Sequence, residues 1–110
     1  MYSQIKIKEM EENKTFLVIT AIVNKQNIAE VPEYLGSVMQ IFGQNGGTPV
    51  GRYKTINALV GDDSPEMMAV IEFDSPKTIE DMVNGEAFNA LTELRARVFS
   101  KLNMIISQNM

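Results

Sequence analysis

The chain has 110 residues, of which 45% are apolar and 22% charged, and this balance is typical of one globular domain. It contains neither cysteine nor histidine, which excludes disulfides, zinc–thiolate sites, iron–sulfur clusters, a catalytic thiol and any imidazole base or ligand. Ten basic residues against fourteen acidic ones, without a basic cluster, argue against a nucleic-acid partner. We therefore predict no metal and no other cofactor.

The N-terminal region carries charged residues and no apolar block of signal-peptide length. No apolar run in the sequence reaches the roughly 20 residues that cross a bilayer, so we expect no membrane partner and a cytoplasmic location. The charged connector from Glu9 to Lys14 predicts a flexible extension over residues 1–14. Residues 15–110 then form a single domain.

The first predicted element is a strand from about Thr15 to Asn24, followed by a turn at 24–27. Its central stretch, 16–23, is apolar at almost every position, which is typical of a strand buried on both faces. One face can be covered by the chain's own helices. Because so short a chain has no third layer, we expect a second copy of the chain to cover the other face.

A helix is predicted from about Ala29 to Phe42, since apolar residues recur there at spacings of three and four. The Asn45-Gly46-Gly47 sequence ends this helix with residues that tolerate positive φ. A second extended segment is predicted from Thr48 to about Val60. The turn signal that follows leads to a third strand, residues 67–73.

The second helical region starts at Ser75-Pro76, breaks at Gly85 and continues over residues 86–101, before a short last strand at 104–106. The order strand, helix, strand, strand, helix, strand is the ferredoxin-like βαββαβ arrangement. We predict an α+β fold in which both helical regions cover one face of a four-stranded antiparallel sheet. A homodimer through the open sheet face would bury the other side.

Several short motifs in this order resemble the family known as domain of unknown function 1330. They are Tyr34-Leu35, Asn45-Gly46-Gly47, Val70–Ser75, Asn84–Phe88 and Leu94-Arg95. The resemblance covers nearly everything from Phe16 onward and implies two subunits that form a dimeric α+β barrel. Its superfamily includes small monooxygenases of antibiotic biosynthesis, haem-degrading monooxygenases, chlorite dismutase and muconolactone isomerase, which use the barrel interior as a pocket.

The chain departs from the family's usual pattern at four positions. The pattern has histidine where this chain has Asn45, a tryptophan near Met82, and serine and tyrosine near Gly85 and Phe88. If the family uses that histidine as a general base, this chain lacks it.

Three residues are candidates for catalysis. The guanidinium of Arg95 could donate two parallel hydrogen bonds to a carboxylate or enolate and stabilise an anionic intermediate. Glu72, within an apolar strand, or Asn45 could then handle the proton. For Arg95 the alternatives are a surface position or an ion pair with Glu72, Asp74 or Glu93. For Glu72 they are an exposed strand end or a pair with Arg52 or Arg95, and for Asn45 a simple turn role.

Tyr34, Arg52 and Tyr53 are candidates for substrate binding. The resemblance places Arg52 and Tyr53 at the mouth of the pocket, and Tyr34 could present its hydroxyl there or lie at an amphipathic rim. Together with the open sheet face, the resemblance implies a small homodimer with an internal apolar pocket. If the protein is an enzyme, we expect a cofactor-independent monooxygenase or isomerase of a small apolar compound. The alternative is a non-catalytic module for small-ligand binding or dimerisation.

Overall fold

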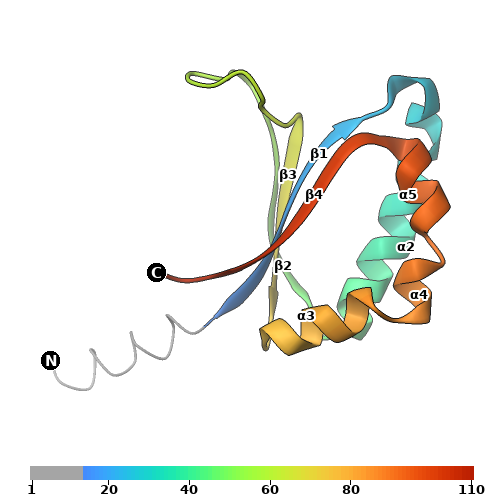
Figure 1. The fold of residues 1–110 in the computed structure, drawn as a ribbon, viewed down its shortest axis with the longest axis vertical. Helices are drawn as coiled ribbons and strands as arrows, with labels where there is room; N and C mark the ends of the chain where they lie inside the picture. Colours follow the sequence, from blue (N-terminus) through green and yellow to red (C-terminus); the bar gives the residue numbers. More distant parts are fainter. Residues whose placement is uncertain (1–13) are drawn as a thin grey trace, which may run out of the picture.

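The computed structural model describes residues 14–110, which form a four-stranded antiparallel sheet with every helix on the same side (Figure 1). The sheet order is β2-β3-β1-β4, which confirms the ferredoxin-like α+β prediction. In chain order the elements are β1 (Thr15–Val23), the 3-10 helix η1 (Lys25–Glu30), α2 (Val31–Gln44), β2 (Thr48–Lys54), β3 (Met67–Phe73), α3 (Pro76–Val83), α4 (Glu86–Asn89), α5 (Thr92–Val98) and β4 (Phe99–Gln108).

Three predicted boundaries were wrong. The predicted turn at 24–27 is the start of η1, where the Asn24 side chain accepts a hydrogen bond of 3.1 Å from the Gln26 amide. β2 ends at Lys54 instead of reaching Val60, and residues 55–66, which we call the arm, are neither helix nor strand. β4 begins at Phe99, inside the predicted helix. It pairs with β1 along nearly its whole length, and this pairing provides hydrogen-bond partners for the backbone N–H and C=O groups of β4.

The sheet has one covered and one uncovered face. Leu17 and Ala21 of β1 and Ile71 of β3 point to the helices and are buried. Alternate residues of the same strands point away and are only half-buried or exposed in the single chain, although β1 was predicted to be buried on both sides. This open face is formed by Phe16, Val18, Thr20, Ile22, Tyr53, Met68, Val70, Glu72 and Ile105.

Helix α2 is fixed against the sheet at its C-terminal end. Gly46 adopts a φ of +80°, as the predicted tight exit requires, and the amide of Gly47 donates a hydrogen bond of 2.8 Å to the carbonyl of Phe42. Phe42 packs edge-on against Phe73 of β3, with ring centroids 6.1 Å apart. These contacts hold the C-terminal end of α2 against β3.

The predicted extension over residues 1–14 lies outside the described residues, apart from Lys14. Within residues 14–110, no helix is long and apolar enough to cross a membrane. The cytoplasmic location stays a prediction.

Candidate functional site

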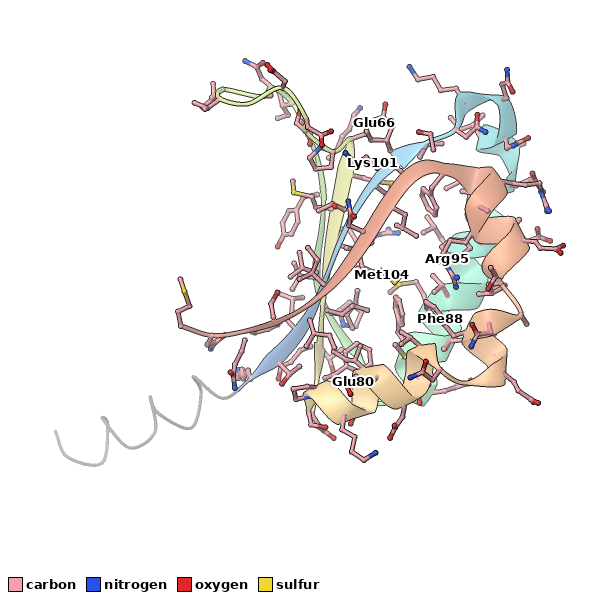
Figure 2. All side chains as sticks on the ribbon, viewed as in Figure 1. Glu66, Glu80, Phe88, Arg95, Lys101 and Met104 are labelled. Carbon is pink, nitrogen blue, oxygen red and sulfur yellow. The ribbon has the colours of Figure 1, made fainter. Side chains whose placement is uncertain are left out.

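Arg95 is held inside the helical layer by four contacts. Its Nε donates a hydrogen bond of 2.9 Å to the hydroxyl of Tyr34, and its Nη2 donates one of 3.0 Å to the carbonyl of Phe88. Its guanidinium carbon lies 4.0 Å from the centroid of the Phe88 ring and 5.7 Å from that of Tyr34. Figure 2 shows Arg95 and Phe88 beside each other among the helices. Arg95 thus joins α2, α4 and α5.

Tyr34 belongs to the core and is not a rim residue, since its side chain is only 2% exposed. Its ring packs edge-on against Phe99 of β4, with centroids 5.3 Å apart. Burial raises the pKa of the Tyr34 hydroxyl above 10.0, and the hydrogen bond and charge of Arg95 oppose this rise. The phenol is therefore neutral at physiological pH and accepts the bond from Arg95 through its oxygen.

The guanidinium of Arg95 has only neutral partners in the described part of the chain. The ion pair considered with Glu72, Asp74 or Glu93 does not form among residues 14–110. A half-buried positive charge without a carboxylate favours the approach of an anion or of an oxygen that gains negative charge.

A small cavity of about 40 Å³ lies between α2 and the helix-covered face of the sheet. Its exposed lining is apolar, and Tyr34 and Arg52 are the residues with polar groups along its wall. The other lining residues come from α2 and the strands β1, β3 and β4: Ile19, Ala21, Leu35, Val38, Met39, Phe42, Met67, Met68, Ala69, Phe99, Leu102 and Met104. The pocket is thus within one subunit, on the covered side of the sheet.

Arg52 and Tyr53 point to opposite faces of β2, because they are adjacent in a strand. Arg52 pairs in register with Ala69 and lies at the edge of the cavity, and no carboxylate among residues 14–110 forms an ion pair with it. Tyr53 is on the open face and lines, with Arg52, a separate open hollow of about 890 Å³ at the base of the arm. The structure therefore brings Tyr34 and Arg52 to one cavity and leaves Tyr53 outside it.

The two other catalytic candidates lie apart from Arg95. Glu72 is on the open face, where its Oε1 is 3.9 Å from the Nζ of Lys14. Asn45 ends α2 and donates a hydrogen bond of 2.8 Å from Nδ2 to the carbonyl of Ile41, which fits the turn role. No hydrogen bond or ion pair within residues 14–110 joins any two of these three side chains, and no cluster of carboxylates there is placed to hold a metal ion.

A sequence model of the family described as domain of unknown function (DUF1330) matches residues 14–110. The chain belongs to this family. The match confirms the resemblance seen in the motifs and covers the entire described domain. The chain has no significant match among curated proteins.

Solved structures similar to this DUF1330 chain share its fold at low sequence identity. A protein of unknown function from Rhodopseudomonas palustris has a TM-score of 0.74 and 13% identity, over 100% of this chain and 94% of that chain. A DABB-family protein with a ferredoxin-like fold from Mesorhizobium loti has a TM-score of 0.66 and 12% identity, over 88% and 97%. A NIPSNAP-family protein of unknown function from Agrobacterium tumefaciens has a TM-score of 0.60 and 12% identity, over 88% of each chain. These similarities support the fold alone.

Phe88 was not among the site residues predicted for this DUF1330 chain, although its ring lies against the guanidinium of Arg95. The two residues belong to separate short helices, α4 and α5, so no helical spacing in the sequence marks their contact. The cavity wall was missed for a different reason. Its methionines and aliphatic residues are chemically ordinary core residues, and only packing decides where a space remains between them.

Proposed function

We propose that the protein is a homodimer through the open face and that each subunit holds a small apolar compound in the cavity beneath α2. The cavity is the observation that carries the second part. Its wall is apolar, and it is bordered by one buried phenol and by the guanidinium of Arg52, which forms no ion pair within residues 14–110. This is the composition of a small-molecule site. The open face supports the first part, since Val70, Val18 and Ile105 form an apolar row across three strands.

The cavity must widen when a ligand enters. At about 40 Å³ it is smaller than the roughly 150 Å³ that accommodates a benzene ring. Met39, Met67 and Met104 line it, and their unbranched side chains can change rotamer with little cost. Arg52 at the edge favours a ligand with a carboxylate on its outer end.

Benzoate and benzamide test this site, because they share a ring and differ in charge. We expect chemical-shift changes on the methyl groups of Val38 and Met39 on titration with benzoate, and affinity about tenfold lower for benzamide. Arg52→Gln removes the preference for benzoate. Ala69→Val, which adds methyl groups to the wall, blocks both compounds. Binding of benzoate that Ala69→Val leaves unchanged would exclude the cavity as the site.

Val18→Lys tests the dimer. Val18 is at the centre of the open face, paired with Val70 on one side and Ile105 on the other. A lysine ammonium buried there without a partner would prevent face-to-face association. We expect monomers or aggregates in sedimentation velocity, whereas the unmodified chain sediments as a dimer. A soluble Val18→Lys dimer would contradict the face-to-face arrangement.

A second candidate function is cofactor-independent catalysis on the bound compound, by isomerisation or monooxygenation. The hydrogen bond between Arg95 and Tyr34 favours it, because a neutral phenol beside a guanidinium can stabilise an enolate oxygen. In an isomerisation, a proton leaves one carbon and returns to another, so no co-reactant is needed. In an oxygenation of a CH₂ group to a carbonyl, O₂ accepts four electrons from the substrate and its second oxygen atom leaves as water.

The binding module and the enzyme differ in what Arg95 and Tyr34 do to a bound ligand. A binding module keeps the ligand unchanged, as native mass spectrometry of a co-purified compound would show. An enzyme exchanges an acidic hydrogen of the ligand for deuterium in ²H₂O, and Tyr34→Phe slows this exchange without weakening binding. Glu72 lies on the open face, so its replacement by glutamine serves as a matched control for the exchange.

A further inference from the structure

The arm carries three large aliphatic side chains that the subunit itself does not bury. Ile56 is 98% exposed, Leu59 89% and Val60 95%. All three residues fall within the extended segment predicted from Thr48 to about Val60. In the structure β2 has already ended at Lys54. Three exposed aliphatic side chains within one short segment mark an interaction surface.

The base of the arm is fixed to the sheet, so its direction is set by the fold. The amide of Thr55 donates a hydrogen bond of 2.9 Å to the carbonyl of Glu66. Glu66 is itself bound to β1, since its amide donates to the carbonyl of Ala21 at 3.0 Å and its carboxylate accepts from the amide of Val23 at 2.9 Å. Figure 2 shows Glu66 and Lys101 where the arm leaves the sheet.

The arm extends to the uncovered side of the sheet. In Figure 1 the helices lie on one side, and the loop between β2 and β3 bends to the other. The C-terminal end of β4 turns to the same side from the opposite end of the sheet. The aliphatic residues of the arm are therefore presented where a molecule seated on the open face would be.

The area of the open face leaves room for a contribution from the arms. Four strands of about eight residues make a face roughly 19 Å wide and roughly 27 Å long, on the order of 500 Å². A stable interface takes about 800 Å² of surface from each partner. Side-chain relief makes the accessible area of the face larger than this flat footprint, and an arm from each copy adds further contact area at its margin.

We propose that the arm reaches over the open face onto a second copy of this chain and buries Ile56, Leu59 and Val60 against it. This inference rests on the proposed dimer and adds the element that stabilises it. Two copies related by a two-fold axis contribute one arm each, so every aliphatic residue of the arm acts twice in the interface.

The test replaces Ile56, Leu59 and Val60 together by serine in the full chain. Because these side chains are almost fully exposed in the subunit, the variant keeps its circular dichroism and its urea midpoint as a monomer. We expect the dimer dissociation constant, measured by sedimentation equilibrium, to increase by about tenfold or more. Ile28→Ser is the matched control, since Ile28 is an exposed aliphatic residue of η1 on the helical side, and its dissociation constant stays unchanged.

The outcomes separate this inference from the proposed dimer. If the triple variant dimerises as tightly as the unmodified chain while Val18→Lys does not dimerise, the arm inference is overturned and the face-to-face dimer stands. If the unmodified chain is a monomer at all concentrations, both fail.

A labelled variant gives a second, independent measurement. The chain has no cysteine, so Leu59→Cys provides a single site for an environment-sensitive fluorophore. We expect its emission to shift to the blue as the concentration rises through the dimer dissociation constant. Emission that stays that of a solvent-exposed label in the dimer overturns the inference even if the triple variant does not fold.

Discussion

The Nε of Arg95 donates a hydrogen bond of 2.9 Å to the hydroxyl of Tyr34, although the two residues are 61 positions apart in the sequence. The bond joins α5 to α2 in the layer that covers the sheet. Because both partners are partly or fully removed from water, neither finds an easy substitute when the other is lost. This pair therefore links the stability of the helical layer to the wall of the cavity, which Tyr34 lines.

The strength of the link can be measured with a double-mutant cycle of Tyr34→Phe and Arg95→Met. Tyr34→Phe leaves a guanidinium N–H without its acceptor, and we expect a loss of about 1–3 kcal/mol in the free energy of unfolding. The coupling energy from urea unfolding of the four proteins should be about 1 kcal/mol in favour of the native pair. Additive effects of the two substitutions would show that the bond contributes nothing to stability.

The buried phenol also makes stability depend on alkaline pH. The folded-state pKa of Tyr34 is raised above its ordinary value of 10.0 by burial. Above pH 10.0 the unfolded chain loses this proton while the folded chain keeps it, so ionisation favours the unfolded state and the free energy of unfolding falls as pH rises.

We expect this fall to be steeper in the unmodified protein than in Tyr34→Phe when urea unfolding is measured from about pH 9 to about pH 11. Tyr53→Phe removes a phenol from an exposed position of β2 and serves as the control, with the steep fall retained. Identical pH profiles for the unmodified protein and Tyr34→Phe would contradict the raised pKa.

Two glycines of this chain should respond to alanine in opposite directions. A Cβ at Gly47 would lie 2.8 Å from the carbonyl oxygen of Phe42 and from the ring of Phe73, so Gly47→Ala forces backbone and ring apart. We expect it to destabilise the fold by about 1–3 kcal/mol. Gly36 lies within α2, and no atom of residues 14–110 beyond its own helical turn and chain neighbours lies within 4 Å of its Cβ position, so Gly36→Ala should stabilise the fold by about 0.5–1 kcal/mol. Thermal unfolding of both variants measures this, and a stable Gly47→Ala protein would show that α2 can shift against the sheet.

The fold was predictable from the sequence because its signals are local. The apolar run over 67–73 predicted both ends of β3 correctly. The predicted helix start at Ser75-Pro76 is a true cap, since the Ser75 hydroxyl accepts a hydrogen bond of 3.2 Å from the Thr78 amide. The element order then determines the sheet order. The errors occur where tertiary pairing overrides local propensity, as in β4, which continues a helical pattern as a strand because β1 offers it partners.

The candidate site was predictable only in part, since it depends on which side chains meet. Tyr34 and Arg95 were both selected from the sequence, but their contact depends on the crossing of α2 and α5, which no spacing encodes. Glu72 was placed in an apolar strand correctly, and whether it points to the helices or to the open face depends on register. Arg52 and Tyr53 show the same rule, because adjacent strand residues point to opposite faces of the sheet and only Arg52 borders the cavity beneath α2.

Xenon tests whether the cavity under α2 is dry. An apolar space without polar partners for water remains empty and accepts xenon, and this cavity of about 40 Å³ has an apolar exposed lining. Under xenon pressure, we expect shifts of the methyl resonances of Ala21, Val38 and Ala69, while those of the exposed Ile28 do not move. Ala69→Val fills part of the space, so it should abolish these shifts and raise the free energy of unfolding by up to about 1 kcal/mol. Shifts that survive Ala69→Val would place the xenon elsewhere, and a destabilised Ala69→Val protein would show that the wall is already closely packed.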